Sequence, residues 1–243
     1  MTNYRAIAFA LVVLVALAYV PIPAQAATSD IGAGMSAKLA RGITNTFTGF
    51  IELPAQTVKG AKNGVKGISY APVSHPVGTL VGMARGVHQG AGRTLSGVQE
   101  SVGFWAADYD SNEGYGIPFD GKYAWDEGTQ FHMLEPNIGE GLAPLGKKLV
   151  RGTGTALFSW MEFPGQIVIN SKKGNPGLGI IEGTYFGLSR LYGGSTDAVL
   201  FALPNPKDTV GNDYEQDYPW DALMDKEKTT EMEAAPAAEE AVR

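Results

Sequence analysis

Four arginines and four carboxylates occupy matching positions in the two halves of this chain. Such side chains can line a groove for a polar ligand, or they can form forked ion pairs that satisfy charge within or between the two halves. Because residues seven or eleven apart share a face of a helix, each arginine should lie on the same face as one carboxylate, and the favoured interpretation is structural pairing within or between the copies. The predicted pairs are Arg41 with Glu52, Arg151 with Glu162, Arg93 with Glu100, and Arg190 with Asp197.

One loop resembles the start of a calcium-binding loop. Asp108, Asp110 and Asn112 follow the D-x-D-x-N pattern, but Glu113 stands where the pattern wants Gly and Phe119 where it wants Glu. The second half has no copy of the motif. We interpret the stretch as a polar turn and keep a weak calcium site as the alternative.

No catalytic constellation is evident. His75, His88 and His132 show no metal-ligand spacing and the chain has no cysteine, so we expect no metal site and no cofactor. A carboxylate pair for glycoside hydrolysis stays open as an alternative. Trp125 and Trp220, each beside a tyrosine, could stack on sugars, but we favour a role as caps on the hydrophobic core.

The elements that carry these residues occur twice. The stretch Lys38–Val58 recurs as Lys148–Val168 at a shift of 110 residues, and Gly82–Phe104 recurs as Gly179–Phe201 at a shift of 97. Repeats fix architecture before residue-level interpretation begins. Because loops absorb length changes and helices do not, the change in shift predicts a helix–loop–helix unit. Pro54 should kink or end the first helix.

Glycines recur at strict four-residue spacing in both copies, beside an apolar stripe that runs from Leu80 to Trp105. A glycine inside a helix costs about 0.5–1 kcal/mol relative to alanine, so the ladder needs a cause. We expect it to let the two copies of the long helix pack closely, with assembly between chains or at lipid as the alternative. The ladder comprises Gly78, Gly82, Gly86, Gly90, Gly179, Gly183 and Gly187.

The predicted fold is mainly α: two tandem helix–loop–helix repeats whose glycine-spaced helices pack as a pseudo-symmetric four-helix arrangement. The first residues, with Arg5, an apolar run and Ala24-Gln25-Ala26, are typical of a secretory signal peptide. The predicted segments are a signal peptide at 1–26, repeat unit 1 at 27–129, a bridge at 130–144, repeat unit 2 at 145–223 and a disordered acidic tail at 224–243.

The pattern from Lys38 to Pro54, followed by a glycine-spaced helix ending in an arginine and an acidic residue, resembles exosortase system-associated proteins. The resemblance covers both repeats, although the second has Thr155 where the first has Asn45. It implies an exported protein of the periplasm or outer cell envelope, in the context of surface protein sorting and exopolysaccharide export. It implies no reaction.

The sequence therefore predicts an exported, non-enzymatic envelope protein with a structural or adaptor role. Its expected partners are envelope proteins or components of sorting and polysaccharide export. The net charge of −6 argues against nucleic acid. One alternative is a peripheral membrane-binding or oligomeric, pore-like assembly of amphipathic helices, with membrane-surface contact and self-association. Another is an envelope hydrolase.

Overall fold

The described chain consists of helices joined by irregular loops. The computed structural model describes residues 31–109, 111–119, 121–125, 138–214 and 218–221. Within these ranges, β pairing is limited to three isolated bridges. The prediction of a mainly α fold with four packed helical arms is confirmed. The predicted signal peptide and acidic tail lie outside the described residues.

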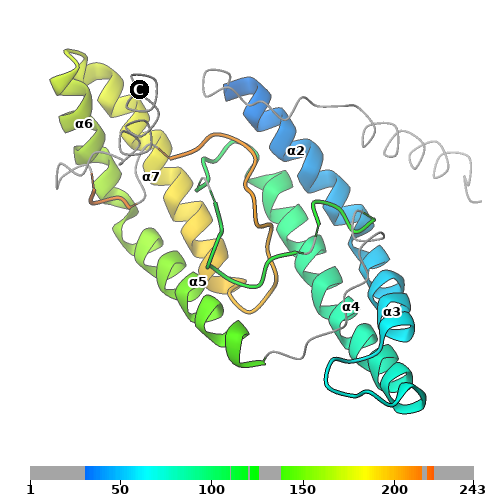
Figure 1. The fold of residues 1–243 in the computed structure, drawn as a ribbon. Coiled ribbons are helices and arrows are strands. Elements are labelled where there is room, and N and C mark those ends of the chain that lie inside the picture. The colour runs from blue at the N-terminus through cyan, green and yellow to red at the C-terminus, as the bar shows by residue number, and fades with distance from the viewer. Residues whose placement is uncertain (1–30, 110, 120, 126–137, 215–217, 222–243) are drawn as a thin grey trace, which may run out of the picture.

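The first hairpin pairs a broken helix with a long one (Figure 1). Its first arm is α2 (Ile31–Thr48), the short 3₁₀ segment η1 (Gly49–Ile51) and α3 (Glu52–Asn63), and its second arm is α4 (Ala71–Val102). Pro54 lies in the first turn of α3 and has no amide proton for an α-helical hydrogen bond across the break. The predicted interruption of the helix at Pro54 is therefore confirmed.

The second hairpin repeats this plan. Its first arm is α5 (Ile138–Phe158), the 3₁₀ segment η3 (Ser159–Met161) and α6 (Glu162–Lys172), and its second arm is α7 (Pro176–Val199). Pro164 takes the place that Pro54 has in the first hairpin. Residues at corresponding positions thus lie in corresponding elements.

Two helices begin earlier than the sequence predicts. Helix α5 starts at Ile138, inside the segment 130–144 that we interpreted as a bridge. Helix α4 starts at Ala71, nine residues before the apolar stripe begins at Leu80, and accommodates Pro76 in its interior. Glycine and proline favour loops locally, but packing against a neighbouring arm overrides that preference.

The glycine ladders face the other arm of their own hairpin. A Cβ atom added at Gly86 would lie 2.7 Å from the Cα atom of Leu53, and one added at Gly183 would lie 2.8 Å from the Cα atom of Phe163. The principal helix–helix contacts pair α2 and α3 with α4, and α5 and α6 with α7. The expectation that the two long helices meet along their glycines is wrong. Each long helix instead packs against the arm to which a short turn joins it, as consecutive elements usually do.

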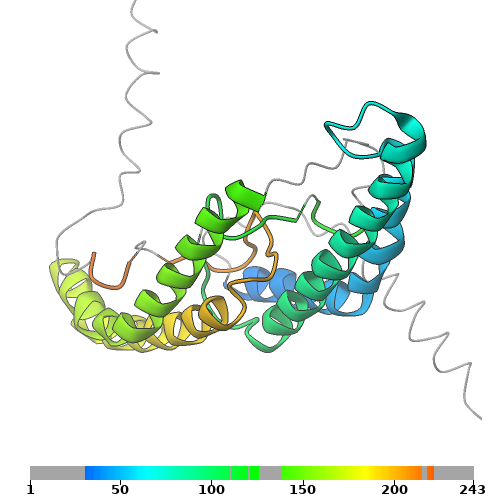
Figure 2. The same cartoon turned by 90° about the horizontal axis from the view of Figure 1, so that it is seen from below.

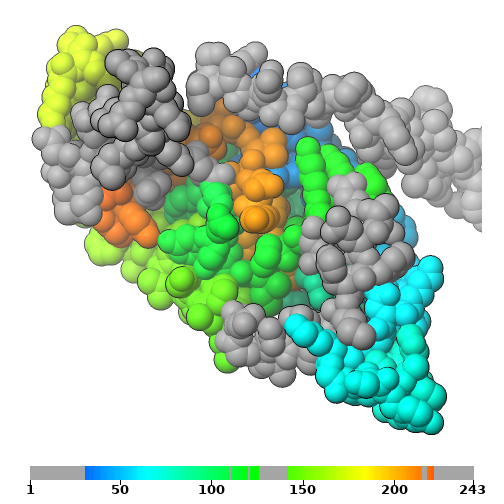
Figure 3. Space-filling view, in the orientation of Figure 1, coloured from blue at the N-terminus to red at the C-terminus, as the bar shows by residue number. Residues whose placement is uncertain are grey.

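The hairpins are joined through the loops that follow α4 and α7. These loops occupy the space between the two hairpins (Figures 1 and 3). Asp108 pairs with Asp213, Pro118 with Asn205, and Ser111 with Asp208. Asp108 corresponds to Asn205 at a shift of 97 residues, and Pro118 to Asp213 at a shift of 95, so the first two bridges exchange corresponding positions. Ser111 and Asp208 are themselves 97 residues apart, and the pairing therefore follows a pseudo-two-fold relation. Seen from below, the hairpins diverge from these loops and place their turns at opposite ends (Figure 2).

Polar side chains fill the interior of each hairpin, and large apolar side chains cover its outside. The largest fully buried side chains include Arg93, Arg190 and Gln56. In contrast, Leu80 is 68% exposed and Val199 is 77% exposed. The apolar stripe of α4 therefore faces outward, opposite to the orientation that a water-soluble helix adopts.

Candidate functional site

Two buried ion pairs lie between the arms, one in each hairpin. Arg93 Nε donates to Glu52, and Arg190 Nε donates to Glu162, with all four side chains essentially inaccessible to solvent. The side-chain amide of Gln56 donates to Glu52 over 3.2 Å, and Gln166 donates to Glu162 over the same distance. Removal of one member would leave a buried charge uncompensated, which is the costly way to break such a pair.

Two further ion pairs lie closer to the central loops. Arg41 forms a fork on Glu100, with Nε donating over 3.0 Å and Nη2 over 2.5 Å. Arg151 donates through Nη2 to Asp197 over 2.9 Å. The guanidinium of Arg151 also lies between the rings of Tyr109 and Tyr115, at 4.2 and 4.1 Å from their centroids.

The eight residues predicted to pair do form ion pairs, but with different partners. Arg41 pairs with Glu100 rather than Glu52, and Glu52 pairs with Arg93. In the second hairpin, Arg151 likewise pairs with Asp197 rather than Glu162, and Glu162 pairs with Arg190. The prediction used spacing along one helix, whereas antiparallel packing brings residues from both arms to the same level of the seam. Each pair therefore fastens one arm of a hairpin to the other.

Sequence reasoning passed over two buried lysines, although both belong to the repeated Lys-Leu pair that begins the motif. Lys38 Nζ donates to the Ala106 carbonyl and forms an ion pair with Asp108, each over 2.8 Å. Lys148 Nζ donates to the carbonyls of Leu200 and Leu203. The halves differ here, because the position matching Asp108 is Asn205, which offers no negative charge.

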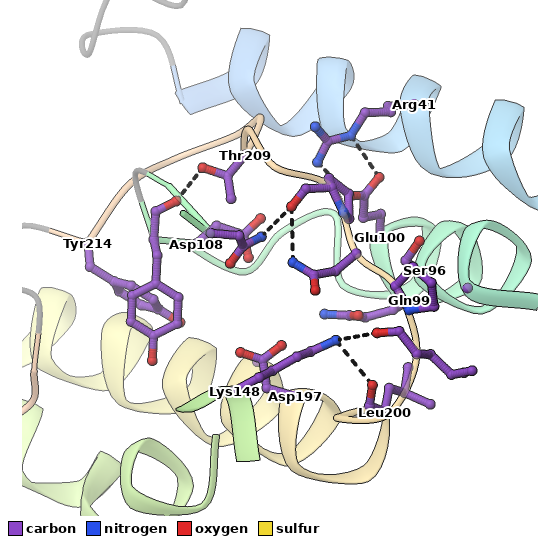
Figure 4. A pocket seen from close by; sticks show the side chains of 18 residues that line it. Arg41, Ser96, Gln99, Glu100, Asp108, Lys148, Asp197, Leu200, Thr209 and Tyr214 are labelled. Atoms are coloured by element: carbon purple, nitrogen blue, oxygen red, sulfur yellow. Dashed lines mark hydrogen bonds and ion pairs between the residues drawn. The ribbon is translucent and has the colours of Figure 1, made fainter. Parts of the chain in front are cut away.

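A small cavity of about 50 Å³ lies between the two loops (Figure 4). At about 10–15 Å³ each, it has room for about three to five water molecules. Its wall carries acidic and basic groups in ion pairs with each other, including Glu100 with Arg41. Lys148 and Asp197 also line it, and in Figure 4 the lysine side chain passes close to this carboxylate.

Burial governs the titration of both groups. Desolvation raises the pKa of Asp197, and the nearby Arg151 and Lys148 partly offset this effect. Desolvation lowers the pKa of Lys148, with Asp197 opposing the change. Both shifts disfavour charge in this region. The geometry suits a structural seam, because the carboxylates are already engaged by cations.

The described residues of the candidate calcium loop make other contacts. Asp108 pairs with Lys38, while the Asn112 side chain accepts from Arg151 and donates to the Pro206 carbonyl. Asp110 and His132 lie outside the described residues. Among the residues with a described position, no three His, Cys, Asp or Glu side chains form a group suited to a metal. His75 and His88 each contact a backbone carbonyl.

The aromatic residues stack on one another in matching pairs. Tyr123 and Trp125 are parallel with centroids 4.8 Å apart, and Tyr218 and Trp220 repeat this at 4.9 Å. Trp220 also meets the ring of Phe158 edge-on, whereas Trp125 is exposed. The interior that these residues adjoin is largely polar, so they do not cap a conventional hydrophobic core.

The most distinctive surface is the apolar exterior of the helices. The exposed positions of α4 are all apolar, and those of α7 carry no charge; Arg85 and Glu182 on these helices are half-buried. Exposed apolar residues also occur on the first arms. The larger ones are Phe47, Phe50, Leu80, Val87, Val102, Val150, Leu157, Trp160, Ile181, Leu188 and Val199.

No helix in the described part of the chain is both long and apolar enough to cross a bilayer. The apolar positions alternate with glycines and buried polar residues, which lowers the mean hydropathy of each helix. Comparison with known proteins found no match to a protein-family model, a curated protein or a solved structure.

Proposed function

We propose that this protein is an exported, non-enzymatic cell-envelope protein whose helical hairpins bury their outward apolar faces in the lipid of a membrane surface. The observation that carries the proposal is the inverted distribution of polarity: Arg93 and Glu52 lie inside, while Leu80 and Val87 lie outside. Leaving apolar surface in water costs about 25 cal/mol per Å², and contact with lipid removes this cost.

Lipid fits this surface better than one protein partner does. A docking site for a protein is a contiguous apolar patch with a polar rim. Here the apolar side chains belong to both hairpins and to both arms of each, from Phe50 on η1 to Val199 on α7. A hydrocarbon environment can cover all of these faces together.

The interior also suits a chain with little access to water. Groups removed from water must find partners within the protein, and the buried ion pairs and the side-chain NH₂ groups of Gln56 and Gln166 do so. The close approach at the glycine ladders supplies packing that does not need large apolar side chains between the helices.

A structural role fits the polar groups better than catalysis does. A hydrolase needs two carboxylates facing a cleft, whereas Glu100, Asp197 and Asp108 at the cavity each have a cationic partner. The resemblance of the Lys38–Pro54 motif to exosortase system-associated proteins supports an envelope setting in surface sorting or polysaccharide export. Components of such a system remain the expected protein partners.

Vesicle flotation tests the proposal. We expect the purified chain to float with neutral phosphatidylcholine vesicles. The variant V87E/L95E should lose most of this binding, because two carboxylates would have to enter an apolar environment. The control K207E changes charge on an exposed loop and should float like the wild type.

Circular dichroism should show that V87E/L95E keeps its helices, so that lost flotation reports lost contact with lipid. A wild-type chain that stays in the vesicle-free fraction and sediments as a defined oligomer would overturn the proposal. That result would assign the apolar faces to contacts between copies of this chain.

A further inference from the structure

The turn of each hairpin carries a pair of exposed lysines. Lys62 lies in the last turn of α3 and Lys66 in the turn before α4, while Lys172 ends α6 and Lys173 lies in the turn before α7. The two turns lie at opposite ends of the molecule (Figure 2). Helix α4 extends away from the first pair and α7 from the second, each with an outer face that carries no charge. The cations are therefore placed at the ends of the apolar surfaces.

The charge around these turns contrasts with that of the whole chain. The net charge is −6, yet the stretch from Leu53 to Gln99 contains neither Asp nor Glu, and neither does the stretch from Phe163 to Ile181. The exposed acidic residues of the described chain, Glu113, Asp208 and Asp213, lie in the central loops. Within the described residues, each turn therefore carries two lysines and no carboxylate, in a chain that is negative overall.

The first turn has a further feature of a membrane interface. Tyr70, directly before α4, exposes 68% of its surface beside the lysine pair. Tyrosine is enriched where hydrocarbon meets headgroups, because its ring is apolar and its hydroxyl is polar. Along the first hairpin, the apolar outer face of α4 is followed by Tyr70 and then by the lysine pair. This order matches that of hydrocarbon, interface and headgroups in a bilayer.

We propose that the two turns bind the headgroups of anionic phospholipids, through Lys62 and Lys66 in one hairpin and Lys172 and Lys173 in the other. This inference rests on the proposed lipid contact and adds the lipid class to it. Lysines near an anionic surface each strengthen binding about fivefold, so a pair contributes about 25-fold. The effect declines with added salt, since ions screen exposed charges.

The experiment compares binding of the full chain to neutral phosphatidylcholine vesicles and to vesicles that also contain phosphatidylglycerol. We expect the wild type to bind the anionic vesicles more tightly. K62Q/K66Q and K172Q/K173Q should each lose about 25-fold on anionic vesicles and bind neutral vesicles unchanged. K62R/K66R keeps the charge and should keep the preference.

The control K122Q/K207Q removes two exposed lysines from the central loops and should bind both vesicles like the wild type. Equal wild-type affinity for both vesicles would overturn this inference and leave the proposed function standing. An equal loss for the control would also overturn it, because the attraction would then come from any surface lysine. Binding to neither vesicle would remove the proposed function itself.

Discussion

At the scale of single residues, the protein depends on buried charges that join two arms. Arg93 lies on α4 and Glu52 at the start of α3, so their ion pair fastens helices that the sequence separates by a turn. Buried pairs contribute little net stability, but they fix which residues face each other. We infer that they set the register of each hairpin.

The pairing itself can be measured with a double-mutant cycle. We expect a coupling energy of about 1–3 kcal/mol between R41M and E100Q, because the two side chains form a buried fork. The pair R41M and E52Q should couple by less than about 0.5 kcal/mol. Urea unfolding in mild detergent gives the four free energies of each cycle. A larger coupling to Glu52 would restore the pairing that spacing predicted.

Lys148 gives a prediction about pH. Burial lowers its pKa, so between that lowered pKa and the ordinary 10.5 the unfolded chain binds more protons than the folded chain. Stability therefore rises with pH through this window, since the folded state favours the neutral amine. We expect the free energy of unfolding of the wild type to rise relative to that of K148M as pH approaches 10.5. A difference that stays constant or falls would contradict this assignment.

At the scale of elements, glycine determines how closely the arms approach. The ladder residues lie against backbone atoms of the preceding arm, so the missing Cβ atoms allow contact between the helices themselves. The four-residue spacing predicted close packing correctly. The partner helix could not be read from it, because a ladder fits any backbone that lies across it.

Matched glycine substitutions should have opposite effects. G86A places a methyl group 2.7 Å from the Cα atom of Leu53, and we expect it to cost about 1–3 kcal/mol through overpacking. G146A meets nothing within 4 Å on α5 and should stabilise the chain by about 0.5–1 kcal/mol, because alanine favours a helix. Denaturant midpoints in detergent would measure both. A stabilising G86A would contradict the tight contact.

At the scale of the whole molecule, the central loops hold the two hairpins together. The backbone amide of Asp108 donates to the Asn212 carbonyl over 2.8 Å, and Asn205 donates to Ile117 over 3.0 Å at the corresponding place. The two hairpins thus exchange contacts through these loops. The molecule is thus joined at its polar centre, while its apolar arms diverge.

A crosslink would test this arrangement. Ser111 and Asp208 form an antiparallel bridge, and directly opposed residues place their Cα atoms about 4.5–5.5 Å apart, within the range of a disulfide. Because the chain has no cysteine, S111C/D208C should form one intramolecular disulfide on oxidation, read as faster migration in non-reducing electrophoresis. The neighbouring combination S111C/K207C should crosslink less. Equal or absent crosslinking would contradict the pairing of the loops.

From the sequence alone one can predict that the chain is helical, where proline interrupts the first arm, and which positions of the two halves are equivalent. Those properties follow from local backbone preferences and from periodicity, which need no knowledge of what a helix packs against. The sequence also identified Arg41, Glu52 and their counterparts as residues that form ion pairs, although the partners predicted from spacing were wrong.

Which face of each helix lies inside follows from the packing of the arms and could not be predicted from the sequence. A stripe such as Leu80, Val87 and Val102 shows that a helix has two different faces, but the same period results whether water or lipid surrounds it. Contact between the arms at Gly82 and Gly86 requires the glycine face to be buried, and this turns the apolar face outward. The ion-pair partners and the lysine-bearing turns follow from the same packing, because it sets which distant residues meet.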